Sequence, residues 1–142
     1  MKILVSACLL GVKCRYNGAE KANEEVVALA GKHTLIPFCP EIYGGLPTPR
    51  DPAEIKDGRV VTEAGNDVTT QYRKGAEDAL RVARMLGCEC ALLQDRSPSC
   101  GIGTVHNGLF DGGLVPGDGV TAALLRQAGI LLVPASQAEE LL

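Results

Sequence analysis

Four short apolar segments set the strongest limit on the fold of this chain. They cover residues 2–7, 34–38, 90–94 and 130–134, and each has the length of a buried strand. Stretches with helical signals lie between them, and this alternation is typical of a parallel sheet with right-handed crossovers. We therefore predict an α/β fold with a single domain over residues 1–142. It would be a Rossmann-like open, mainly parallel sheet with helices on both faces and small hairpin insertions.

The clearest helical signal runs from Asp67 to Leu86, where apolar side chains recur at helical spacing. Asp67 is the predicted N-cap, and Gly87 is the residue expected to end the helix. The other predicted helices are residues 23–30, residues 119–128 and a short terminal helix capped by Ser136 that runs through Leu142.

Two insertions break the alternation of strands and helices. Residues 53–63 are predicted to form a hairpin around the turn Asp57-Gly58, and residues 104–110 a second hairpin. The proline-rich segment 40–52 is predicted to be a rigid, extended loop without helix, because proline at this density disfavours helix.

The composition limits the function classes. A length of 142 residues with 46% hydrophobic residues suits one core, and a net charge of -3 gives no broad basic surface for nucleic acid. No apolar segment approaches the ~20 residues of a membrane helix, and residues 1–7 are too short for a signal peptide. We expect a cytoplasmic protein with no membrane contact. Six cysteines in a reducing compartment indicate a metal, a cluster or catalysis more than disulfides.

Three cysteines share one position relative to the predicted strands. Cys8, Cys39 and Cys100 each follow the end of an apolar segment. Because ligands of an open parallel sheet bind outside the carboxyl ends of its strands, we expect the three thiols to meet there. Cys88 and Cys90 lie at the start of a strand and are interpreted as small buried side chains. Cys14 lies on the loop after the first strand, and nothing in the sequence fixes its position.

Three thiolates form an incomplete ligand shell. They suit a catalytic zinc ion that keeps one position open. They also suit a 4Fe–4S cluster in which one iron lacks a protein ligand and acts as a Lewis acid toward sulfur. The residues alone leave both interpretations open, together with the interpretation that the cysteines only fill the core.

Polar residues near these cysteines are further candidates. Glu41 lies two residues after Cys39 and is a candidate general acid or base. Ser97 and Ser99 flank Pro98 beside Cys100 and serve either turn formation or substrate binding. The candidate substrate-binding residues are Arg15, Asn17 and Arg50. His33 and His106 have no metal-like spacing and are interpreted as structural or surface residues.

As a set and in this order, the motifs around these residues resemble one family, the thiouracil desulfidase-like family that was formerly a bacterial domain of unknown function. The motifs that support the resemblance are Ser6-Ala7-Cys8-Leu9-Leu10-Gly11, Arg15-Tyr16-Asn17-Gly18, Cys39-Pro40-Glu41, Gly45-Leu46-Pro47-Thr48-Pro49-Arg50 and Ser97-Pro98-Ser99-Cys100-Gly101. One departure is Gln94, at a place where many relatives are expected to have Lys.

The resemblance implies a 4Fe–4S cluster held by Cys8, Cys39 and Cys100, with the cluster lost or replaced by zinc in preparations made in air. It implies the removal of sulfur as sulfide from a small thiolated substrate, with water replacing the sulfur and no net redox change. Glu41 would shuttle a proton, and Ser97 or Ser99 would orient the substrate. The alternatives are a zinc hydrolase on the same cysteines and a module that binds thiolated RNA or sulfur without catalysis.

Overall fold

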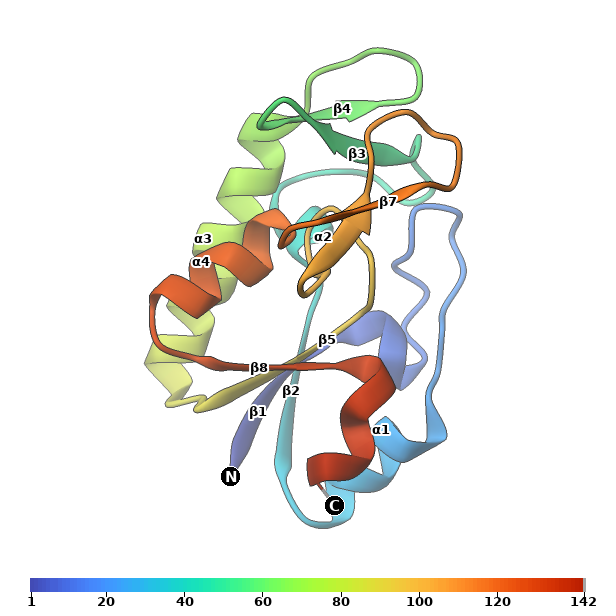
Figure 1. The fold of residues 1–142 in the computed structure, drawn as a ribbon. Helices are drawn as coiled ribbons and strands as arrows, with labels where there is room; N and C mark the ends of the chain where they lie inside the picture. The colour runs from blue at the N-terminus through green and yellow to red at the C-terminus, as the bar shows by residue number, and fades with distance from the viewer. Residues whose placement is uncertain (142) are drawn as a thin grey trace.

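The centre of the protein is a four-stranded parallel sheet, seen in the computed structural model, which describes residues 1–141 (Figure 1). Its strands lie in the order β2-β1-β5-β8, and every neighbouring pair is parallel. The strands are β1 (Lys2–Ser6), β2 (Thr34–Phe38), β5 (Cys90–Leu93) and β8 (Leu131–Pro134). All four apolar segments are confirmed as strands, each to within a residue at either end.

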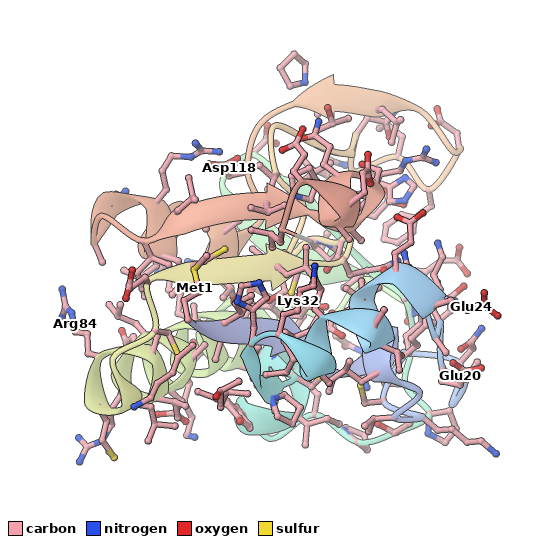
Figure 2. All side chains as sticks on the ribbon, turned by 90° about the horizontal axis from the view of Figure 1, so that it is seen from below. Met1, Glu20, Glu24, Lys32, Arg84 and Asp118 are labelled. Atoms are coloured by element: carbon pink, nitrogen blue, oxygen red, sulfur yellow. The ribbon has the colours of Figure 1, made fainter. Side chains whose placement is uncertain are left out.

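Helices cover both faces of this sheet. The helices α3 (Thr69–Leu86) and α4 (Val120–Gln127) lie on one face, and α1 (Glu24–Ala28) lies on the other with the C-terminal 3₁₀ segment Ala135–Leu141 (Figure 1). The charged side chains Glu20, Glu24 and Arg84 lie at the periphery of the molecule (Figure 2). No helix among residues 1–141 is long and apolar enough to span a membrane.

The period-two alternation of side chains along β1 produces the two halves of the core. Leu4 packs with Ala79, Ala83 and Leu125 on the face covered by α3 and α4. Ile3 and Val5 face the opposite way, toward the face covered by α1 and the C-terminal segment. Because successive side chains of a strand point to opposite faces, a strand buried on both sides has a continuous apolar sequence. The predicted fold class is confirmed.

Two antiparallel hairpins extend beyond the carboxyl edge of the sheet (Figure 1). The first pairs β3 (Ala53–Lys56) with β4 (Arg59–Thr62), and its turn residues Asp57 and Gly58 have φ values of 50° and 76°, as predicted for this hairpin.

The second hairpin pairs β6 (Thr104–His106) with β7 (Leu114–Pro116). It therefore extends beyond the predicted residues 104–110, and its loop is longer than predicted. A carboxylate oxygen of Glu54 accepts hydrogen bonds from the backbone of Gly108 at 2.9 Å and Phe110 at 3.1 Å. These bonds hold residues 107–113 as a loop against the first hairpin instead of a tight turn.

The helices differ from the predictions at several points. The helix α2 (Pro40–Tyr43) begins where an extended loop was predicted, because proline is compatible with the first position of a helix. The helix α3 begins at Thr69, so its N-cap is Val68 and not the predicted Asp67, which accepts a hydrogen bond from the Thr69 backbone at 2.9 Å. The helix ends at Gly87 as predicted. Only residues 24–28 of the first predicted helix are α-helical, followed by a 3₁₀ turn.

The predicted terminal helix is a 3₁₀ segment, Ala135–Leu141, with a break at Gln137 (φ -117°, ψ 23°). Leu142, the last residue of that prediction, lies outside the described residues.

The contact between α2 and α3 depends on two glycines. A Cβ atom at Gly75 would lie 1.8 Å from the carbonyl oxygen of Pro40, and one at Gly44 would lie 2.0 Å from the carbonyl oxygen of Gln71. The backbones of the two helices therefore touch, and this contact sets the position of α2 and of the residues it contains.

We predict that Gly75→Ala destabilises the protein by about 1–3 kcal/mol, because the added methyl group overpacks the contact. In an ordinary helix the same change is stabilising. Gly31→Ala is the matched control, since no atom of residues 1–141 lies within 4 Å of a Cβ atom built there. Urea unfolding of both variants measures the difference, and a Gly75→Ala protein as stable as the wild type would contradict the described contact.

Candidate active site

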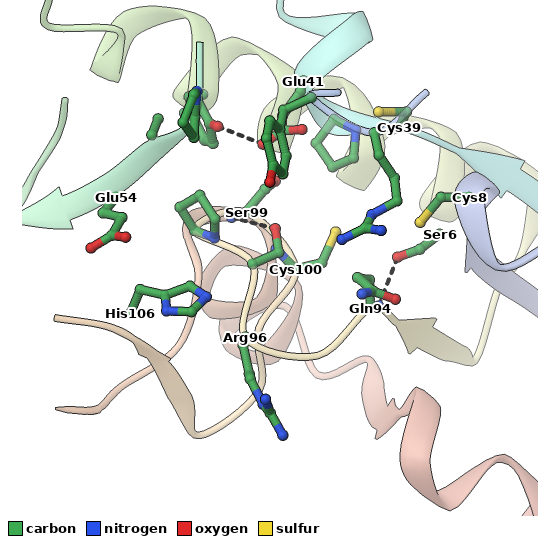
Figure 3. Close-up of a pocket in the computed structure, with 18 of the residues that line it drawn as sticks. Ser6, Cys8, Cys39, Glu41, Glu54, Gln94, Arg96, Ser99, Cys100 and His106 are labelled. Carbon is green, nitrogen blue, oxygen red and sulfur yellow. Dashed lines mark hydrogen bonds between the residues drawn. The ribbon is translucent and has the colours of Figure 1, made fainter. Parts of the chain in front are cut away.

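A cavity of about 350 Å³ lies between the carboxyl edge of the sheet and the two hairpins. Cys8, Cys39 and Cys100 all line it (Figure 3). Cys8 lies in the 3₁₀ turn after β1, Cys39 directly follows β2, and Cys100 lies in the loop after β5. The structure thus brings together the three thiols that share a position after a strand end.

The chemistry of the three thiols limits the group that they could hold. Among residues 1–141, no group of three or more His, Cys, Asp or Glu side chains is arranged to hold one metal ion. A cluster of four irons is larger than one ion, and an all-thiolate donor set suits it chemically. The residues present therefore fit an iron–sulfur cluster.

The surroundings of the three thiols shift their pKa values in different directions. Burial raises the pKa of the Cys100 thiol to about 12. A hydrogen bond with the Cys14 side chain, followed by burial, raises the pKa of Cys39, whereas a hydrogen bond with Cys14 lowers the pKa of Cys8. Negative charge on Cys39 raises the pKa of both Cys8 and Cys100, and negative charge on Cys100 raises the pKa of Cys8. Three thiolates at this place therefore need a bound cation to offset their repulsion.

The other cysteines fall into two groups. Cys14 is buried, lines the cavity, and is a hydrogen-bond neighbour of both Cys8 and Cys39. Cys88 and Cys90 lie outside the cavity, in the two halves of the core on opposite faces of the sheet. Their interpretation as buried apolar side chains agrees with this position.

Glu41 is held by two partners. It lies in the first turn of α2, and its side chain is 17% exposed. Tyr72 of α3 donates a hydrogen bond to one carboxylate oxygen, and Arg50 forms an ion pair with the other. Burial and the charge of Glu41 raise the pKa of Tyr72, so its hydroxyl stays protonated and donates. The carboxylate is therefore fixed at the wall of the cavity.

Arg50 connects several segments behind that wall. Its guanidinium donates hydrogen bonds to the carbonyl oxygens of Cys14 at 2.9 Å and Pro47 at 3.2 Å, and to the hydroxyl of Thr48 at 3.0 Å. Arg50 is not among the residues that line the cavity. Its arrangement suits a residue that positions Glu41 and the loop of Cys14.

The other two predicted substrate-binding residues lie in different places. Arg15 lines the cavity. Asn17 lies outside the set of lining residues, and its side-chain oxygen accepts a hydrogen bond from the Ala19 backbone at 3.0 Å within a turn. A substrate contact by Asn17 stays a prediction.

Ser97 and Ser99 both line the cavity beside Cys100. The Ser97 hydroxyl accepts hydrogen bonds from the backbone of Ser99 at 3.0 Å and of Cys100 at 3.1 Å. The Ser99 hydroxyl pairs with that of Thr121 in α4 at 2.8 Å. Both hydroxyls thus hold the loop of Cys100, and their catalytic role stays a prediction.

Sequence reasoning missed several residues of the cavity wall. Ser6 bonds the Gln94 backbone at 3.0 Å and also hydrogen-bonds the Cys100 thiol. Its place two residues before Cys8 was a signal for this role. The helical periodicity of residues 67–86 marks Tyr72 only as an apolar position, and the spacing of His106 indicates a structural or surface residue, yet both line the cavity. Contacts between distant segments bring them there.

Comparisons with known proteins identify the family. The model of the 2-thiouracil desulfurase family matches residues 3–137, and the chain belongs to this family. The uncharacterized protein YbbK of Bacillus subtilis (strain 168) is 41% identical over 150 residues, which cover 99% of each chain. A solved structure of the 4Fe–4S-dependent thiouracil desulfidase TudS superposes with a TM-score of 0.93 at 48% identity, covering 99% of this chain and 94% of that chain.

We predict that Arg50→Ala destabilises the protein by about 3 kcal/mol or more, because it leaves the carboxylate of Glu41 and the Cys14 carbonyl without this partner. Arg59→Ala is the matched control. It removes an ion pair with Asp67 whose side chains are 52% and 45% exposed, and we expect a loss of about 1 kcal/mol or less. Equal losses in urea unfolding would show that the Arg50 pair is not a structural connection.

Proposed function

We propose that residues 1–142 form a single iron–sulfur domain that removes sulfur from a thiolated pyrimidine or a similar small thiolated compound. The observation that supports this most directly is the meeting of three thiols, from three strand ends, in one cavity with a fixed carboxylate. Membership of the 2-thiouracil desulfurase family and the likeness to TudS supply the reaction and the cofactor.

Cys8, Cys39 and Cys100 are the proposed ligands of a 4Fe–4S cluster. Such a cluster supplies one iron without a protein ligand, which acts as a Lewis acid for a soft sulfur atom. A reducing compartment such as the cytoplasm, the predicted location, would keep these thiols available for iron. The all-thiolate donor set supports the cluster.

The proposed reaction exchanges a thiocarbonyl for a carbonyl. Water supplies the oxygen, its two protons are released to base and to the departing sulfur, and sulfur leaves as sulfide, so no atom changes its overall redox level. Glu41 is the proposed base, because its carboxylate lines the cavity and is held by Tyr72 and Arg50. A positioned carboxylate that accepts a proton from water is general base catalysis.

The remaining predicted site residues differ in whether they line the cavity. Ser97, Ser99 and Arg15 line the cavity and are proposed to orient the substrate directly. Arg50 is proposed to act through Glu41, which it holds from behind the wall. Fixed groups of this kind accelerate a reaction by holding reactants in productive geometry.

The first test of the cluster is a set of cysteine variants purified without oxygen. Cys8→Ser, Cys39→Ser and Cys100→Ser are each expected to lose most of the iron and acid-labile sulfide, which should be about four irons per chain in the wild type. Cys88→Ala is the matched control, because Cys88 lies outside the cavity. About one zinc per chain and no iron would refute the cluster and favour the hydrolase alternative.

The second test concerns Glu41. We predict that Glu41→Gln lowers the rate of sulfide release from 2-thiouracil by about 10²-fold or more, the usual contribution of a general base, while the iron content stays at the wild-type level. Tyr72→Phe removes only one hydrogen bond to the carboxylate and should cost less. A Glu41→Gln enzyme with full iron and full activity would exclude Glu41 as the base.

A further inference from the structure

His106 differs from an ordinary structural histidine. It is the last residue of β6, and it lines the cavity that contains the three thiols (Figure 3). Its Nδ1 atom is buried and has no hydrogen-bond partner among residues 1–141. Because native proteins leave few buried polar atoms unpaired, such an atom in a cavity wall indicates a partner that the protein itself does not supply.

The second histidine of the chain shows the contrast. His33 lies outside this cavity, and both of its ring nitrogens have partners: Nδ1 lies 3.1 Å from the N-terminal amine and Nε2 lies 2.8 Å from the carbonyl oxygen of Leu141. That ring is fixed by the fold. Within the described part of the chain, no comparable bond fixes the Nδ1 side of His106. Because χ2 of histidine is a broad torsion, the ring can turn toward a ligand.

The backbone around His106 is rigid. The loop that follows it is closed by a hydrogen bond from Asn107 to Asp111 at 2.9 Å and one from the Asn107 backbone to Gly113 at 3.0 Å. Glu54 holds the backbone of Phe110, whose φ of 55° is uncommon for a residue with a side chain. Conformations of this kind occur where the surroundings enforce them, often at ligand sites. The wall is therefore formed before a ligand binds.

His106 lies across the cavity from two of the predicted cluster ligands. Cys8 and Cys39 lie on one side of the view in Figure 3, and Glu54 and His106 lie on the other. A ring whose sulfur faces the thiols therefore presents its other polar edge toward the hairpins. In a thiolated pyrimidine that edge contains ring nitrogen and, in thiouracils, a second carbonyl oxygen.

We propose that His106 is a specificity-determining residue, whose imidazole N–H donates a hydrogen bond to the second carbonyl oxygen of a thiouracil ring. This inference rests on the proposed desulfidase function. It narrows the substrate class to cyclic thioamides that have a carbonyl group besides the thiocarbonyl. The hairpins would then select the substrate ring, and the residues at the sheet edge would carry out the removal of sulfur.

Binding of sulfur-free analogues tests this inference without turnover. Uracil has the second carbonyl group, and pyrimidin-2-one lacks it. Calorimetry with the cluster-loaded wild type should show uracil binding about tenfold or more tightly than pyrimidin-2-one, and His106→Ala should remove most of that difference. His106→Gln, which keeps an N–H donor, should restore part of it. His33→Ala is the matched control and should leave it unchanged.

Turnover adds a second readout. With 2-thiouracil, His106→Ala should raise KM about tenfold with kcat within about threefold of the wild type, whereas pyrimidine-2-thione should show little change between the two proteins. Equal losses for both compounds, in binding or in KM, would overturn the inference and indicate a structural role. If the loaded wild type binds uracil through His106 but releases no sulfide from either thione, the inference holds and the proposed function fails.

Discussion

The ion pair between Glu41 and Arg50 is the interaction on which the geometry of the cavity depends. It joins α2 to the proline-rich loop, Arg50 extends it to the loop after β1 through the Cys14 carbonyl, and Tyr72 extends it to α3. Burying such a pair costs desolvation, which is offset when further hydrogen bonds satisfy both partners. The hydrogen bonds described above supply these partners, and only Nε of Arg50 has no partner in the described chain.

The position of this pair has a consequence for chemistry. Only Pro40 separates Glu41 from Cys39. The ion pair that fixes the Glu41 carboxylate therefore also restricts the position of Cys39, a predicted cluster ligand. The direct backbone contact of α2 with α3 at Gly44 and Gly75 leaves little freedom for either residue. A base held in this way needs little reorganisation when a substrate enters, which is the advantage of a site built on rigid elements.

The sequence predicts the parts of this structure that depend on local patterns. The four strands were found because buried parallel strands have continuous apolar sequences, and β2 has the predicted bounds, Thr34–Phe38. The meeting of Cys8, Cys39 and Cys100 could be predicted because the carboxyl ends of parallel strands lie at one edge of the sheet. The helix α2 was missed because its proline was read as a helix breaker, although the first helical position accepts proline.

The parts that could not be predicted depend on long-range contacts. Tyr72 reaches Glu41 across 31 positions, and Glu54 reaches the loop after His106 across 54 positions. Periodicity identified Tyr72 as an inward-facing residue of a helix but could not say which polar group would meet its hydroxyl. His106 was judged by its spacing to other metal ligands, whereas its position depends on the packing of two hairpins.

The loop of Cys100 shows how much of the predicted cluster site is set by the backbone alone. At the start of α4, the N–H groups of Val120 and Thr121 donate to the carbonyl oxygens of Pro98 and Ser99 at 2.8 and 2.9 Å. The first N–H groups of a helix have no partner within it, so this loop satisfies them. A Cβ atom at Gly119 would lie 2.5 Å from Ser99, which shows how closely the two segments approach. The helix and the loop therefore fix each other, and the thiol of Cys100 is positioned by the fold before any metal binds.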